Sequence, residues 1–249
     1  MASVPLIFAE EGVEDGRKED IFTNFDHNFA RNDNIYNANI QIRMAFLRKV
    51  YGLLSMQLLM TVFVALIFMV CEPIKFFIQQ NTWTIYVSCF LMIGITIPLY
   101  IKRKDHPANL ILLSAFTLSM AYSIGVLVSL IDKSIVLEAL FITLTVVIGL
   151  TAYTFQTKRD FTFLSSALFT GLCVLIVAGF LQIFIHNTLL ELAICIGGIL
   201  LFSLYIIVDT QLLMLRHSPE EYILATIHLY VDIINLFLRI LQLIMILKK

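Results

Sequence analysis

Seven long apolar runs follow one another after the first 40 residues of the chain, and short polar segments separate them. The runs cover approximately residues 50–70, 84–101, 109–130, 136–154, 163–185, 189–214 and 222–247. A helix needs about 20 apolar residues to cross the hydrocarbon core of a bilayer, and each run approaches that length. Only helices and closed barrels satisfy their backbone polar groups in lipid. The pattern therefore predicts an all-α integral membrane protein with seven transmembrane helices.

The segment before these runs differs from them in composition. Residues 1–40 are acidic at first and then rich in asparagine, and they show no sustained hydrophobic period. We interpret them as a largely disordered cytosolic tail and residues 41–249 as the transmembrane domain. The chain is 59% hydrophobic and 14% charged, whereas a soluble domain carries about 25% charged residues. Its surplus of apolar surface therefore faces the lipid bilayer.

Basic residues are distributed unevenly between the two sides of the predicted bundle. The N-terminal side carries Arg43, Arg48, Lys49, Lys102, Arg103, Lys104, Lys158, Arg159 and Arg216, and the other side carries Lys75, Lys133, Lys248 and Lys249. Cytosolic loops carry the excess of Lys and Arg, so the N-terminus is predicted to be cytosolic. A complete seventh span would leave the last two lysines on the opposite side. A re-entrant last segment is the alternative.

Two aspartates interrupt the last two apolar runs, Asp209 in the sixth and Asp232 in the seventh. An ionised carboxylate in hydrocarbon is costly unless it is paired, hydrated or protonated. The two runs form a hairpin, so both carboxyl groups lie at similar depths. If they face each other, both cannot ionise cheaply, and we expect them to share one proton. Such a pair would act as a pH sensor and gate, because the shared proton holds the helices together and its loss separates them.

Further polar residues share one helical face with the second aspartate. They are His228, Asn235, Arg239 and Gln242, spaced three or four residues apart around Asp232. One interpretation is a stripe that lines a hydrated path for cations. The other is a hydrogen-bonded stripe that only orients the helix, with Asp232 paired to Arg239 or His228.

Charged residues near the ends of the runs are candidates for a latch and for cation access. Lys102, Arg103 or Lys104 could pair with Asp209 and close the cytosolic mouth. Glu138 and Glu220 either attract cations or are acids favoured by the start of a helix. Two carboxylates alone make a weak Ca²⁺ site, so Asp209 and Asp232 would hold the ion only transiently.

Motifs for catalysis are missing from the sequence. It contains no HExxH, GxSxG or GxxxxGK[ST] pattern. Intramembrane aspartyl proteases also use two aspartates on adjacent spans, but no glycine follows Gly198 to give access to the backbone beside Asp232. We expect neither enzymatic activity nor a cofactor, and the net charge of −1 implies no nucleic-acid partner.

Five segments resemble the Bax inhibitor-1, or transmembrane Bax inhibitor motif, family. They are Ile42–Tyr51, Gly149–Phe161, Ile206–Thr210, Ser218–Tyr222 and Leu229–Phe237. The likeness covers about residues 40–249 and is strongest to the Golgi anti-apoptotic protein branch, which occurs in animals and some poxviruses.

The resemblance implies a seven-helix bundle with the last helix at its centre. It also implies a pH-sensitive Ca²⁺ leak from intracellular stores, in Golgi membranes and also the endoplasmic reticulum, with a cytoprotective effect. The family's paired aspartates fall on Asp209 and Asp232, its basic latch near Lys102 and Arg103, and acidic positions on Glu138 and Glu220. A membrane-embedded inhibitor of cell death that binds other proteins without conducting ions is the alternative. Self-association and contacts with cell-death or Ca²⁺-release proteins stay open.

Overall fold

The computed structural model describes residues 41–249 except 82, 104, 158, 216–220 and 249. The N-terminal segment 1–40, which we expect to be disordered, and the candidate Glu220 lie outside the described residues. Leu47–Lys249 form one compact unit.

The described chain is helical, and no strand occurs among the described residues. The first helix is Gln41–Val70. It is followed by α2 (Glu72–Gln80), α3 (Trp83–Ile101), α4 (Ala108–Ser129), α5 (Lys133–Gln156), the short 3₁₀ helix η1 (Thr162–Leu164), α6 (Ser165–Ile185), α7 (Thr188–Leu215) and α8 (Tyr222–Leu247). The predicted all-α class is confirmed, and most predicted runs agree with a helix to within a few residues.

Six of these helices are long and apolar enough to cross a membrane. In α3 the apolar stretch Tyr86–Ile101 is shorter. Because a spanning helix needs about 17–25 residues, α3 is the candidate for the seventh span, and the count of seven stays a prediction.

The segment Glu72–Trp83, predicted as a plain connection, contains the helix α2 of nine residues. Pro73 stands in its first turn, where a missing N–H does no harm. Ile78 is buried, whereas Phe76 and Phe77 are exposed. The helix is too short to cross a bilayer, and a run of nine residues gave no spanning signal in the sequence.

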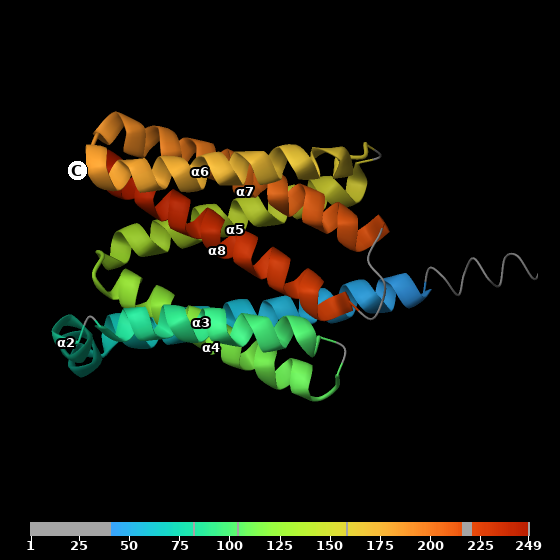
Figure 1. Ribbon diagram of the computed structural model, residues 1–249, viewed down its shortest axis with the longest axis horizontal. Coiled ribbons are helices and arrows are strands. Elements are labelled where there is room, and N and C mark those ends of the chain that lie inside the picture. The colour runs from blue at the N-terminus through green and yellow to red at the C-terminus, as the bar shows by residue number, and fades with distance from the viewer. Residues whose placement is uncertain (1–40, 82, 104, 158, 216–220, 249) are drawn as a thin grey trace, which may run out of the picture. The chain divides into compact units, whose positions relative to one another are not determined.

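The last helix, α8, lies among the others. It packs against α4, α5 and α7, and its Tyr230 hydroxyl hydrogen-bonds the Thr61 hydroxyl of the first helix at 2.8 Å. In Figure 1 it runs diagonally and crosses α5, with one end near α6 and α7 and the other near α3 and α4. This position agrees with the central last helix that the family resemblance implies.

The α8 helix also runs the full length of the bundle. The hydroxyl group of its first residue, Tyr222, accepts a hydrogen bond from the Asn109 amide at the start of α4. Just beyond its end, the Lys248 ammonium group donates a hydrogen bond to the Glu138 carboxylate near the start of α5. Because α4 is 22 residues long and separates these two places, they are opposite ends of the bundle. An unbroken helix between them does not match the re-entrant alternative. We call the end with Asn109 and Tyr222 the Arg103 end, because the Asn109 amide also donates to the Arg103 carbonyl there. The end with Glu138 and Lys248 is the Lys248 end.

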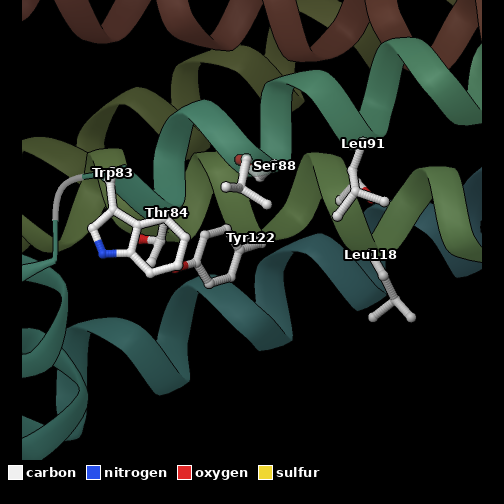
Figure 2. A pocket seen from close by; sticks show the side chains of 8 residues that line it. Trp83, Thr84, Ser88, Leu91, Leu118 and Tyr122 are labelled. Atoms are coloured by element: carbon white, nitrogen blue, oxygen red, sulfur yellow. The ribbon is translucent and has the colours of Figure 1, made fainter.

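Much of the outer surface is apolar, as expected of helices that face lipid. Of the residues described in α6, Leu168 alone is buried, whereas Phe169, Phe180 and Phe184 are exposed. A hollow of about 380 Å³ lies between α3 and α4. Figure 2 shows its lining, which comprises Trp83, Thr84, Val87, Ser88, Leu91, Leu118, Ser119 and Tyr122. None of the candidate charged residues lines this hollow.

The contact between Tyr230 and Thr61 gives a test of how α8 is held. Tyr230→Phe should lower the free energy of unfolding by about 0.5–1.5 kcal/mol, because it removes one buried hydrogen bond and keeps the ring. Unfolding in mixed micelles with increasing dodecyl sulfate measures the change. Tyr86→Phe, at an exposed tyrosine of α3, is the matched control. Equal losses in both variants would contradict a specific role for Tyr230.

Candidate functional site

The polar face of α8 lies against α7. His228 Nδ1 lies 3.9 Å from Asp209 Oδ2, and Gln242 Nε2 donates to Glu191 Oε1 at 3.1 Å. The order of these contacts along the two helices is that of an antiparallel pair. We define the polar seam as the face of α8 that carries His228, Asp232, Asn235, Arg239 and Gln242, together with the α7 residues Asp209, Gly198 and Glu191.

The two aspartates meet in this seam. Asp232 has 7% of its surface exposed, the Asp209 side chain has 16% exposed, and the two carboxyl groups are in hydrogen-bonding contact. A hydrogen bond between two carboxyl groups needs a proton on one of them. Asp232 Oδ2 has no hydrogen-bond partner among the described residues. The structure thus brings together the two groups whose meeting the hairpin argument required.

The partner of Asp232 differs from the one that an orienting stripe would supply. His228 approaches Asp209 rather than Asp232, and its side chain is 53% exposed. Arg239 Nη1 donates to Gln242 Oε1 at 3.1 Å. The alternative interpretation, in which Asp232 pairs with His228 or Arg239 on its own helix, therefore differs from the contacts of the described residues, because the facing helix presents a carboxyl group at the same level.

Polar contacts along the seam fall into two groups. Asp209, Asp232 and His228 form the first, nearer the Arg103 end. Arg239, Gln242 and Glu191 form the second, nearer the Lys248 end. Between them, the Asn235 amide donates to the backbone carbonyl of Val231 at 2.9 Å. Asn235 therefore contacts its own helix and, among the described residues, joins neither group.

The basic latch takes a different partner from the predicted one. Arg103 Nη2 lies 3.8 Å from Glu221 Oε1, and its guanidinium lies 5.0 Å from the centre of the Tyr100 ring. Lys102 is exposed. Asp209 lies six residues before the end of α7, which is roughly 9 Å of helix rise. Glu221 precedes the first residue of α8 and is nearer to the loop that carries Arg103.

A junction of polar groups that the sequence did not predict fixes the start of α8. Asn109 has 1% of its surface exposed. Its amide donates to the backbone carbonyl of Arg103 at 3.1 Å and to the Tyr222 hydroxyl at 2.9 Å. Lys49 Nζ lies 3.4 Å from the centre of the Tyr222 ring, at a distance typical of a cation–π contact. An asparagine at the start of an apolar run was the only signal.

Gln211, two residues after Asp209, holds the loop that follows α5. Its Oε1 accepts from the backbone N–H of Phe161 at 2.7 Å. Its Nε2 donates to the backbone carbonyl of Arg159 at 2.7 Å. The two bonds span 50 and 52 residues of sequence and fix the end of α7 that carries Asp209 against the start of η1.

Glu138 lies at the opposite end, where it forms an ion pair with Lys248. Both side chains are 46% exposed, and such an exposed pair contributes little to stability. Glu220, its counterpart among the predicted sites of cation access, lies outside the described residues.

Within the described residues, no three or more His, Cys, Asp or Glu side chains gather in a way that could hold a metal ion. Ca²⁺ takes 6–8 oxygen ligands. The carboxyl groups of Asp209 and Asp232 alone supply fewer oxygen ligands than that number.

Comparisons with known proteins agree with the resemblance of the five segments. The sequence model of the family described as "Inhibitor of apoptosis-promoting Bax1" matches residues 43–249. Protein lifeguard 4 of Mus musculus is 45% identical over 84% of this chain and 87% of its own. The Golgi anti-apoptotic protein of Vaccinia virus (strain Lister) is 41% identical over 91% and 96%. Bax inhibitor 1 of Schizosaccharomyces pombe is 39% identical over 81% and 76%. The chain belongs to the Bax inhibitor family.

Proposed function

We propose that this protein is a pH-sensitive Ca²⁺ leak channel of intracellular membranes, and that its leak protects cells from apoptosis. The contact between the Asp209 and Asp232 carboxyl groups across the polar seam is the observation that carries the proposal. The name of the viral relative, Golgi anti-apoptotic protein, supports a Golgi location and a protective role. The protein is non-enzymatic, and its N-terminus lies in the cytosol, in keeping with the distribution of basic residues.

The gate works through one proton. While Asp209 and Asp232 share it, a hydrogen bond joins α7 to α8 and one negative charge remains. When the proton leaves, two negative charges face each other where little water screens them, and they repel. The Asp232 oxygen without a partner then gains most from water or a cation. The seam opens at this point, and a divalent cation passes because two carboxylates are too few to trap it.

The ends of the path are set by the charged groups already described. His228, more than half exposed and beside Asp209, is the group through which protons reach the pair. At the cytosolic mouth the Arg103–Glu221 pair holds the α3–α4 loop to the start of α8 and acts as the latch, with Lys102 beside it in sequence. Glu220 gathers cations at this mouth, and Glu138 gathers them at the other when Lys248 swings away.

The shared proton gives a spectroscopic prediction. Infrared difference spectra of the reconstituted protein should contain the carbonyl band of a protonated carboxylic acid near neutral pH. Asp209→Asn and Asp232→Asn should each abolish it, because either change removes one partner of the pair. Asp132→Asn, at an exposed acid before α5, is the matched control and should keep the band. A band that survives in both seam variants would contradict the shared proton.

The gate itself is tested by Ca²⁺ flux from liposomes that contain the purified protein. Flux should rise with pH in the unaltered protein, because the proton that joins the helices is lost. In Asp232→Asn an amide donates to Asp209 at every pH. The pH dependence should therefore disappear and flux should fall about tenfold below the maximum, the effect of about 1.4 kcal/mol of added gate stability.

Asp132→Asn should keep the unaltered flux and pH profile, and a monodisperse elution profile confirms that each variant is folded. Unchanged flux with an unchanged pH profile in Asp232→Asn would overturn the gate.

The family's description as an inhibitor of apoptosis-promoting Bax1 favours one second candidate, a membrane-embedded inhibitor that binds other proteins without conducting ions. Deleting residues 1–35 separates the two functions. As a leak channel, the truncated protein should keep both its Ca²⁺ flux in liposomes and its protection of cells against an apoptotic stimulus. Protection that is lost while flux persists would assign the activity to the N-terminal segment.

A further inference from the structure

The second group of the polar seam is a relay of three charged and polar side chains. Arg239 Nη1 donates to Gln242 Oε1, and Gln242 Nε2 donates to Glu191 Oε1, both at 3.1 Å. Cys195 lies four residues after Glu191, about one turn further along α7, and is buried. The relay therefore connects the guanidinium of Arg239 to the carboxyl group of Glu191 through one neutral amide.

The Arg239 side chain packs directly against the backbone of α7 at a glycine, Gly198, and we call this position the seat of the arginine. A Cβ atom at position 198 would lie 2.9 Å from Arg239 Cγ, 3.0 Å from its Cδ and 3.1 Å from its Nε. Any side chain there would displace the arginine, so the buried Gly198 lets Arg239 lie directly on the helix backbone. The neighbouring Gly197 has no such role, because its nearest atom would be Leu175 Cδ2 at 3.9 Å.

Along the polar seam, the relay lies next to the Asp209–Asp232 pair, on the side of the Lys248 end. Arg239 follows Asp232 by seven residues, which is two turns or roughly 10 Å of α8. Glu191 lies in the first turn of α7, where the helix dipole favours an acid, and Gln242 lies five residues before the end of α8. In the leak proposed above, an ion that moved along the seam between the aspartates and the Lys248 end would pass these charges.

A guanidinium stays charged under all physiological conditions, and by itself it would exclude cations from this stretch. Glu191 offsets that charge. Because Gln242 is the bridge, the two charges remain separate, and a cation can approach the carboxylate without meeting a closed ion pair.

We propose that Glu191, Gln242 and Arg239 form the charge-selectivity element of the ion path, with Gly198 as the seat of the arginine. The proposal rests on the leak function proposed above and adds the residues that decide which sign of charge passes. Glu191 admits cations, Arg239 limits their rate, and the relay holds the two in balance.

The test compares single and double substitutions by flux of Ca²⁺ and of chloride in liposomes. Glu191→Gln leaves Arg239 uncompensated and should lower the ratio of Ca²⁺ to chloride flux about tenfold, as expected for one unit charge near the path. Arg239→Gln leaves the carboxylate uncompensated and should raise that ratio. The double variant should return toward the unaltered ratio. Shifts of the flux ratio in the same direction in both single variants would overturn the proposal. A loss of packing does not depend on the sign of the charge removed, whereas charge selectivity does.

A glycine pair supplies the matched control. Gly198→Ala should displace Arg239 and shift the flux ratio in the same direction as Arg239→Gln. Gly197→Ala should leave it unchanged, because a Cβ there meets only ordinary contacts. Equal effects of the two alanines would also overturn the proposal.

Labelling of Cys195 gives a readout that needs no flux. With Cys71, Cys89 and Cys173, which are exposed, replaced by serine, cationic and anionic methanethiosulfonate reagents report the charge beside Cys195. Glu191→Gln should favour the anionic reagent, and Arg239→Gln the cationic one. A Cys195 that reacts with neither reagent in any variant would show a sealed relay and would overturn its place on the path.

These readouts separate the two proposals. An unaltered protein that carries no flux, while labelling shifts in opposite directions in the two variants, would refute the leak and retain the charge balance of the relay. A leak with the expected pH response, but with no opposite shifts in selectivity, would retain the leak and refute the selectivity element.

Discussion

The rest of the structure depends on one constraint, that an ionisable group inside a bilayer must meet a polar partner on a neighbouring helix. Asp232 meets Asp209 in this way. The contact fixes more than two side chains. Rotating α8 by a single residue would turn its polar face by about 100° and expose the aspartate to lipid. The register and the rotation of the last two helices therefore follow from the need to satisfy one carboxyl group.

The same principle explains why α8 is central. Its apolar face is buried along its length, but lipid would solvate apolar side chains equally well, so burial alone does not place a helix inside a bundle. Polar contacts on several sides do. Tyr230 reaches Thr61 of the first helix, Tyr222 reaches Asn109 of α4, and Gln242 reaches Glu191 of α7. Each bond contributes little, but together they specify one arrangement.

The sequence predicted the features that depend on depth and missed those that depend on rotation. Apolar runs gave the long helices, and the hairpin geometry gave the level at which Asp209 and Asp232 meet. The sequence offered Arg103 as one possible partner of Asp209, whereas Arg103 pairs with Glu221, because a helix that is apolar nearly all round does not reveal which neighbour each polar side chain faces. Gly198 as a seat for Arg239 and α2 were missed for related reasons. The first needs the distance between two backbones, and the second is shorter than any spanning run.

The order of the charges along the seam bears on how a leak can be both gated and limited. A carboxyl pair alone would attract cations and, once it lost its proton, would hold them more strongly as its charge grew. A positive charge two helical turns away opposes that retention, since its repulsion is greatest for an ion that has left the pair and moves toward the Lys248 end. The acid at the start of α7 then lowers the barrier that the arginine raises. In the proposed leak, a carboxyl pair followed by a balanced arginine would favour slow passage over tight binding or free flow, and both elements lie on the interface between α7 and α8.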